Sequence, residues 1–341
     1  EALTGLIPGY ACCQFRGSVL ALDAKTGQIK WRTYMVPTGF SGGAVWGSTP
    51  VVDEKRRSLY ITTGNNYSVP ASVSACVIAA GDNPEAIKAC NPPQNYIDSI
   101  LSLDLKTGAV KWATAAMPFD AWNVDCNPFV GDGDTCPQPS GPDFDFGQGP
   151  MLFTVKAEDG QDRDLVGAGQ KSGQFWALNP DTGATVWVTQ VGPGGFGGGL
   201  QWGSATDGKR IYVADSNSEK KPWTLMQNGL PTNVTTNASF WSALDAATGK
   251  ILWQTRNPTD SFAPGAVSVA NGVMYAGSFD PLGQMYALNA ATGNILWSFT
   301  SGGSVNSGPA IANGMVFWGS GYGQFGPPNT PNNKLYAFRL P

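Results

Sequence analysis

Histidine is absent from this 341-residue chain, and its absence removes several common kinds of functional site. A Ser-His-Asp triad needs an imidazole as its general base. Metal sites with His ligands and Cys-x-x-Cys-His haem attachment need histidine as well. Acid–base chemistry must therefore come from carboxylates, Lys, Tyr or a bound cofactor.

Charge is scarce too. Charged residues make up 13% of the chain, against a usual share of about 25%, and the net charge is −4. Without a basic stripe, nucleic acid and anionic membrane surfaces are poor candidate partners. No apolar run approaches the ~20 residues of a spanning helix. We expect a soluble chain with no membrane span and no nucleic-acid partner.

A repeated motif is the most informative feature that is present. It consists of a short apolar strand, an Asp/Asn-x-x-Thr-Gly turn and a second strand that ends on Trp. Gly supplies the positive φ of the turn, and Asp or Asn bonds its own backbone there. A further strand of this type, at residues 334–339, lacks the turn. The five complete copies are residues 19–31, 100–112, 175–187, 241–253 and 285–297.

The spacing of the motif predicts an all-β fold, a β-propeller of four-stranded blades. Trp253 and Trp297 are 44 residues apart, which matches the roughly 40–50 residues of one blade. Residues 264–299 supply four strands in order. We expect each repeated Trp to pack between neighbouring blades as an apolar plate.

Longer Trp-to-Trp spacings of 81, 75 and 66 residues earlier in the chain predict inserts within blades. These segments are rich in Pro, Asn, Gly and Ser, so we expect surface loops. Loops of this length are usually functional or mobile. The inserts are residues 65–96, 120–148 and 216–239.

The strand count predicts an incomplete ring. The first blade shows only two strands and the last only three, so about five and a quarter blades are present. Because a propeller closes its ring to remove sheet edges, residues 1–341 are either one domain that lacks its N-terminal blades or a small, unusual ring. The first interpretation, with the blades on a second chain, is favoured because residues 1–5 show no signal-peptide pattern and no initiator Met.

Six cysteines fall into three local pairs and predict disulfides formed in an oxidising compartment. Two free or separately paired thiols at Cys12 and Cys13 are the alternative to a vicinal bridge. Sequons at Asn66, Asn233 and Asn237 agree with a secreted glycoprotein if the source is eukaryotic. We expect an extracellular or periplasmic protein. The expected bridges are Cys12–Cys13, Cys76–Cys90 and Cys126–Cys136.

The repeat Ala-Leu-Asp-x-x-Thr-Gly-x-x-x-Trp resembles the tryptophan-docking repeat of pyrroloquinoline-quinone (PQQ) dependent dehydrogenases, over nearly the whole chain. Three segments make it most similar to the polyvinyl-alcohol dehydrogenase-like branch: Cys12-Cys13-Gln-Phe-Arg-Gly, Ala44-Val-Trp-Gly-Ser and Gly64-Asn-Asn-Tyr-Ser. The resemblance implies an eight-bladed ring, of which roughly the first three blades lie outside this sequence. It also implies PQQ and Ca²⁺ as cofactors.

The resemblance assigns candidate cofactor residues. Trp46 aligns with the Trp that stacks on the quinone, Asn65 with an amide ligand of Ca²⁺, and Lys171 with the cation near the quinone oxygens. The plainer interpretations are a packing Trp, a turn former and a solvated lysine. Other cofactor-side candidates are Arg16, Cys12, Cys13, Gln201 and Trp202.

Two positions depart from the family pattern. A Trp-Asp pair supplies the catalytic base in the family, but here the second residue of that pair is Asn123, and an amide cannot accept a proton from an alcohol. Asp120 and Asp125 are the candidate replacements, although Asp in such loops is usually a turn residue. The metal-binding Glu of the family aligns with Cys12, which leaves Asn65 and Asn123 as candidate metal ligands.

The favoured function is a PQQ-dependent oxidoreductase that converts alcohol groups, on a small molecule or a polymer, to carbonyls. Lys171 would polarise the quinone C5 carbonyl, and Asp125 or Asp120 would take the alcohol proton. With no haem motif, electrons would pass to a separate acceptor protein. The alternative is a non-catalytic secreted propeller that serves as a binding or scaffold protein.

Overall fold

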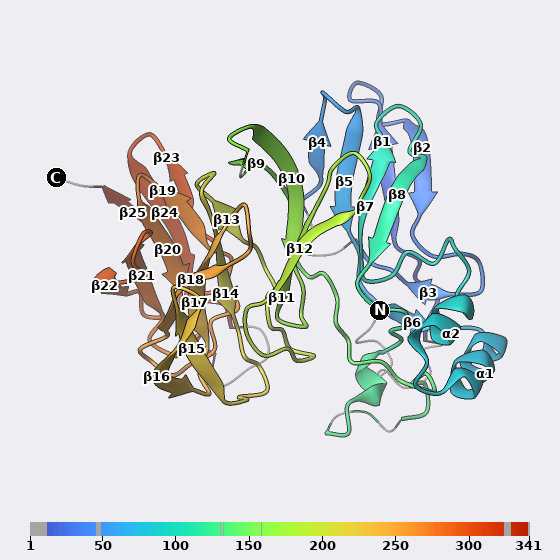
Figure 1. The fold of residues 1–341 in the computed structure, drawn as a ribbon. Coiled ribbons are helices and arrows are strands. Elements are labelled where there is room, and N and C mark those ends of the chain that lie inside the picture. The colour runs from blue at the N-terminus through green and yellow to red at the C-terminus, as the bar shows by residue number, and fades with distance from the viewer. Residues whose placement is uncertain are drawn as a thin grey trace. The chain divides into compact units, whose positions relative to one another are not determined.

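The chain folds into antiparallel sheets, and the expectation of an all-β protein is confirmed (Figure 1). It divides into two compact units: unit 1 has residues 1–150 and 180–184, and unit 2 has residues 151–179 and 185–341. The computed structural model describes residues 12–45, 49–129, 131, 133–157, 159–323 and 329–339.

Unit 1 contains a four-stranded blade, β4-β5-β7-β8, and the two-stranded sheet β1-β2 of the first repeat. A third, small sheet pairs β3 with β6. The two strands of the first repeat agree with the strand count made from the sequence. The strands are β1 Ser18–Leu22, β2 Ile29–Tyr34, β3 Ser41–Gly42, β4 Val51–Asp53, β5 Ser58–Thr62, β6 Asn66–Ser68, β7 Ser99–Asp104 and β8 Val110–Ala115.

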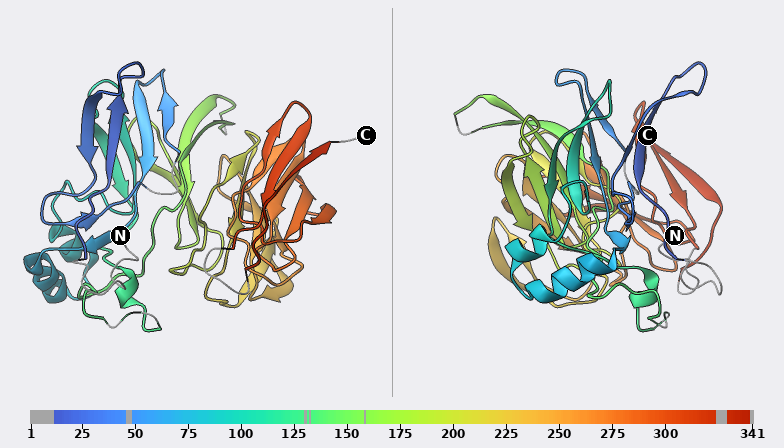
Figure 2. Two further views of the ribbon diagram at one scale, coloured as in Figure 1. Left: turned by 180° about the vertical axis from the view of Figure 1, so that it is seen from behind. Right: turned by 90° about the vertical axis from the view of Figure 1, so that its right-hand side faces the viewer.

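The insert at residues 65–96 is not the expected loop, because it contains the helices α1 (Ala71–Ala80) and α2 (Pro84–Ala89), drawn in Figure 2. Val73 and Val77 lie one helical turn apart and are buried in an apolar cluster of unit 1. The loop prediction was wrong here because the Pro and Asn residues mark the ends of the helices rather than the whole insert.

Unit 2 has the sheets β12-β11-β10-β9, β13-β14-β17-β18-β15-β16, β19-β20-β21-β22 and β23-β24-β25. The last sheet has three strands, as predicted. The strands are β9 Met151–Lys156, β10 Asp162–Gly169, β11 Gln174–Leu178, β12 Thr185–Gln190, β13 Ala205–Thr206, β14 Arg210–Asp215, β15 Trp223–Gln227, β16 Leu230–Thr236, β17 Phe240–Asp245, β18 Ile251–Arg256, β19 Ser268–Ala270, β20 Val273–Gly277, β21 Gln284–Asn289, β22 Ile295–Thr300, β23 Ala310–Ala312, β24 Met315–Ser320 and β25 Lys334–Arg339.

The insert at residues 216–239 also differs from the expected loop. It forms the hairpin β15–β16, and β15 pairs with β18 through Gln227 and Trp253, so the sheet has six strands. The third insert, at residues 120–148, has one short 3₁₀ helix, Val124–Cys126, in its described part and otherwise follows the expectation.

Within each unit, a repeat Trp packs on the Thr-Gly turn of the following repeat. A Cβ added at Gly108, Gly183, Gly249 or Gly293 would collide with the ring of Trp31, Trp112, Trp187 or Trp253, respectively. The Thr two residues after each Trp donates a hydrogen bond to the carbonyl of the same Gly, over 2.6–2.9 Å. The predicted packing of the Trp side chains is confirmed at these four positions, and it requires glycine in the turn.

Candidate functional site

The three predicted disulfides are present, and no free cysteine remains among the residues that the structure describes. Cys12 and Cys13 form the vicinal bridge, so the alternative of free or separately paired thiols is wrong. Because its sulfur is in a disulfide, Cys12 has no thiolate to offer a metal. Trp46, the predicted quinone-stacking residue, lies outside the described residues.

The guanidinium of Arg16, in unit 1, contacts the Val36 carbonyl and the Tyr34 ring. Nε and Nη2 donate to the Val36 carbonyl over 3.1 and 2.7 Å, and the guanidinium carbon lies 4.2 Å from the centre of the Tyr34 ring. Its cation is therefore partly satisfied by a carbonyl and an aromatic face. A ligand anion would compete with these contacts.

Asn65 is buried in unit 1, with 1% of its surface exposed. Its backbone N–H donates to Asp145 Oδ1 over 2.7 Å, and its Nδ2 donates to the Trp122 carbonyl over 2.9 Å. The side-chain amide thus ties the loop after β5 to the insert at residues 120–148.

Asn66 is fully buried and belongs to a network of amide side chains. Its Nδ2 donates to the Ser41 carbonyl and to Asn95 Oδ1, and Asn95 Nδ2 donates back to Asn66 Oδ1 over 2.8 Å. A buried asparagine cannot carry a glycan in the folded protein, so the sequon at this position was wrongly taken as an acceptor. Asn233 and Asn237 are exposed.

The two candidate bases of unit 1 are both buried and bonded to their own insert. Asp120 accepts the Phe144 N–H over 2.7 Å and the Asp143 N–H over 3.3 Å. Asp125 accepts the Gly133 N–H over 3.2 Å, and both the N–H and the hydroxyl of Thr135, over 2.5 and 3.0 Å. Proton transfer to Asp125 would weaken the bonds that shape the loop closed by Cys126–Cys136.

Asn123, at the position of the family's base, is the N-cap of the 3₁₀ helix Val124–Cys126, and its side chain is hydrogen-bonded within unit 1. Its Oδ1 accepts the Asp125 N–H over 2.9 Å, and its Nδ2 donates to the Thr135 and Tyr67 carbonyls. Ca²⁺ takes six to eight oxygen ligands. Within the described ranges no group of three or more His, Cys, Asp or Glu side chains could hold a metal ion. Calcium is therefore not shown, no step is assigned to that ion, and Asn65 and Asn123 stay predictions as its ligands.

Lys171 of unit 2 follows β10 and is 5% exposed. Its carbonyl accepts the N–H groups of Gly195 and Gly199 over 3.1 and 2.9 Å, and the Gln170 carbonyl accepts the Leu200 N–H. A Cβ at Gly199 would collide with this loop. The glycine-rich segment at residues 192–199 therefore wraps the Lys171 loop and brings Gln201 and Trp202, both half-buried, into the same part of unit 2.

Asp215 was missed by the sequence analysis. It ends β14, is fully buried, and pairs with Leu200 beneath the glycine-rich segment. Its Oδ1 accepts the Asn217 N–H over 2.8 Å, while Oδ2 has no hydrogen-bond partner within the described part of the chain. Burial raises the pKa of Asp215 well above its usual value of 3.8, although the Asn217 bond acts in the opposite direction. The one feature of the sequence that could have identified Asp215 is its place at the end of an apolar strand.

A family model described as PQQ_2, outer membrane protein assembly factor BamB, matches residues 239–332. The polyvinylalcohol dehydrogenase of Sphingopyxis sp. (strain 113P3) is 34% identical over 360 residues, which cover 93% of this chain and 49% of that protein. The polyvinylalcohol dehydrogenase of Pseudomonas sp. is 30% identical and covers 92% and 48%. The chain thus spans about half the length of these curated relatives.

Among solved structures, the quinohemoprotein alcohol dehydrogenase from Comamonas testosteroni is similar with a TM-score of 0.65 and 18% identity, over 94% of this chain and 56% of that one. A europium-containing methanol dehydrogenase is similar with a TM-score of 0.60 and 16% identity, over 90% and 61%. Together with the four-stranded antiparallel sheets, this likeness confirms the predicted fold class.

Proposed function

We propose that this chain, which belongs to the superfamily of PQQ-dependent (quinoprotein) alcohol dehydrogenases, serves the oxidation of alcohol groups to carbonyls, with electrons passed to a separate acceptor. The observation that carries the proposal is the buried Lys171, whose loop is held by hydrogen bonds from the glycine-rich segment of unit 2. The relatives matched are named dehydrogenases, which favours this function over the alternative of a non-catalytic scaffold.

The environment of Lys171 suits a quinone with carboxylate groups. A lysine that is 5% exposed presents its charge in a region of low dielectric, where it acts more strongly on a developing oxyanion than it would in water. PQQ, when bound, supplies the two-electron acceptor. Lys171 would orient and polarise it, and Gln201 and Trp202 would line the same side.

The proton of the alcohol needs a base, and Asp120 and Asp125 remain the proposed candidates. Each carboxylate is oriented by N–H donors of its own insert, so each is held in one position. A fixed carboxylate is what general-base catalysis requires, provided that the substrate hydroxyl reaches within hydrogen-bond distance. Arg16, Cys12, Cys13 and Trp46 stay predictions for the cofactor side.

We also propose substrate and location. Two relatives are named for polyvinyl alcohol, so a polymer or a small molecule with alcohol groups is the proposed substrate. Three disulfides favour an extracellular or periplasmic protein. No helix in the described ranges is long and apolar enough to cross a membrane. The single propeller domain completed by blades on a second chain stays a prediction.

The test is reconstitution of the intact protein with PQQ, followed by quinone absorbance and by reduction of an artificial acceptor with primary and secondary alcohols. Lys171→Ala should lower the rate on the order of 10²–10³-fold with an unchanged fold, because one electrostatic stabiliser is lost. Lys209→Ala, an exposed lysine of the same unit, is the control. Absence of both quinone binding and acceptor reduction in the wild type would refute the proposal.

A further inference from the structure

Two contacts between consecutive repeats, one in unit 1 and one in unit 2, have the same strand register but different side chains. Tyr60 pairs with Ser102, two residues before the turn residue Asp104, and Gly167 pairs with Ala177, two residues before the corresponding turn. Tyr60 and Gly167 are therefore equivalent. Counting back four residues from each reaches Arg56, in the turn before β5 of unit 1, and Arg163, the second residue of β10 of unit 2.

Three further positions follow from the same register. Each contact brings together a residue on the second strand, a residue just before the repeat Trp, and a residue just before the Thr-Gly of the next turn. In unit 1 these are Ser58, Lys111 and Asp181, and in unit 2 they are Leu165, Val186 and Ala247.

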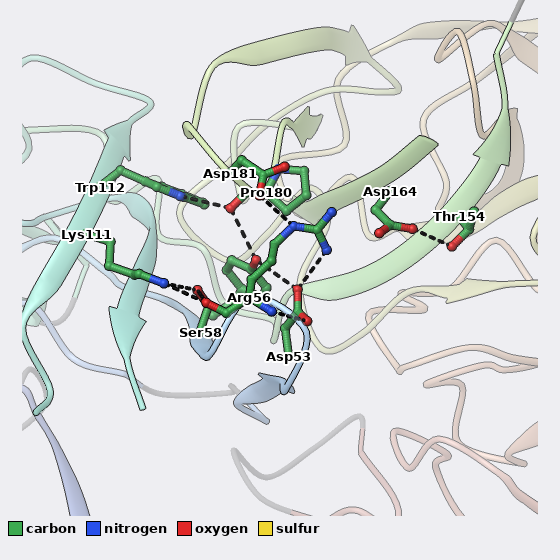
Figure 3. Close-up of polar contacts among 10 residues, drawn as sticks. Asp53, Arg56, Ser58, Lys111, Trp112, Thr154, Asp164, Pro180 and Asp181 are labelled. Carbon is green, nitrogen blue, oxygen red and sulfur yellow. Dashed lines mark hydrogen bonds and ion pairs between the residues drawn. The ribbon is translucent and has the colours of Figure 1, made fainter. Parts of the chain in front are cut away.

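In the unit 1 contact, the polar side chains are joined to one another by hydrogen bonds and ion pairs (Figure 3). Arg56 Nε lies 2.9 Å from Asp181 Oδ1, and Arg56 Nη1 lies 2.9 Å from Asp53 Oδ2. Lys111 Nζ donates to Ser58 Oγ over 2.8 Å. The carboxylate of the following turn thus neutralises the arginine, whose side chain is 13% exposed.

The unit 2 contact keeps the arginine but loses the carboxylate. Leu165, Val186 and Ala247 replace the three polar residues, and Arg163 makes no ion pair within the described ranges and is exposed. A cavity of about 340 Å³ is present there. It is lined by Val155, Ala157, Asp159, Arg163, Leu165, Val186, Ala247 and Thr248.

We propose that this cavity binds a small monocarboxylate with an apolar body, such as a fatty acid of about four to eight carbons. The guanidinium of Arg163 would bind the carboxylate in the way that Arg56 binds Asp181. Leu165, Ala247 and the 40%-exposed Val186 would cover the alkyl chain. The lining also carries the carboxylate of Asp159, whose Oδ1 accepts the Gln161 N–H over 3.0 Å and whose charge acts against that of the ligand.

The site is separate from the proposed cofactor side of unit 2. Arg163 lies near the start of β10, and Lys171 lies in the turn after its last residue, Gly169; the six residues from Arg163 to Gly169 correspond to about 20 Å along a strand. Binding at the cavity therefore goes beyond the proposed oxidation. A loss of one function would not imply a loss of the other.

The first test is calorimetric titration of the intact protein with sodium hexanoate and, as the uncharged match, hexanamide. Hexanoate should bind saturably and at least about tenfold more tightly than hexanamide, since a charged hydrogen bond contributes that much or more. Arg163→Gln should weaken hexanoate binding about tenfold and leave hexanamide unchanged. No saturable binding of hexanoate, or equal binding of the two probes, would overturn the proposal.

The second test supplies the carboxylate from the chain itself. Ala247→Asp places an acid at the position equivalent to Asp181, so hexanoate binding should fall about tenfold or more even if the Arg163 variant fails to fold. Ala291→Asp, the same change at the corresponding position of the next repeat, should leave binding unchanged. Wild-type affinity in the Ala247 variant, or equal loss in both variants, would contradict an arginine-directed site.

Discussion

Replacing the buried acid Asp215 should change how the stability of the protein depends on pH. The carboxyl group is fully buried at the end of β14, and its Oδ2 lies so close to Gly192 that a Cβ there would collide with it. The Asn217 N–H is its one hydrogen bond within the described ranges. Burial without a countercharge favours the neutral form, which is why the pKa of Asp215 is raised.

The sign follows from the proton count. In the unfolded chain Asp215 has its ordinary pKa of 3.8, and in the folded protein its pKa is higher. Between these two values the folded state binds one more proton than the unfolded state. The free energy of unfolding therefore falls by up to about 1.4 kcal/mol per pH unit as the pH rises through this window. Below the unfolded pKa the term vanishes, and above the folded pKa it is constant.

The assay compares denaturant unfolding of the wild type and Asp215→Asn from pH 4 upward, followed by tryptophan fluorescence. The amide keeps an oxygen for the Asn217 N–H but does not titrate. The stability of the variant relative to the wild type should rise by about 1.4 kcal/mol per pH unit and then level off at the folded pKa. Asp162→Asn, an exposed acid, controls for net charge. Parallel pH curves for wild type and Asp215→Asn would refute a buried neutral acid.

Two further predictions concern contacts between repeats. Gly249→Ala should destabilise unit 2 by about 1–3 kcal/mol more than Gly208→Ala. Both glycines have positive φ, but only a Cβ at Gly249 would collide with the Trp187 ring. Equal losses of stability in thermal unfolding would contradict the packing of Trp187 on the Gly249 turn. Ala291→Asp should stabilise unit 2 by about 0.5–1 kcal/mol. Arg210 pairs with Asp207, and Tyr212 donates to Asp207 and to the Ala290 carbonyl, as Arg56, Asp53, Tyr60 and the Pro180 carbonyl do in unit 1, but Arg210 Nε has no partner in the described ranges. An unchanged melting temperature would exclude the new ion pair.

Local sequence determined the repeated part of the fold. The Asp/Asn-x-x-Thr-Gly turn and the Trp that follows specify a hairpin through short-range bonds, and the same Trp then requires glycine in the next turn. The three disulfides also join residues close in sequence, which made their pairing predictable. Lys171 was predicted because it stands in a family motif, and its role stays a prediction.

Tertiary structure decided what depends on neighbours distant in sequence. Composition did not distinguish the α1–α2 helices or the β15–β16 hairpin from loops, because burial of Val73 and Val77 and pairing with β18 stabilise them. The same applies to the sites. Burial beneath the glycine-rich segment raises the pKa of Asp215. Arg163 lines a cavity together with Ala247, which lies 84 residues further along the chain and brings no carboxylate.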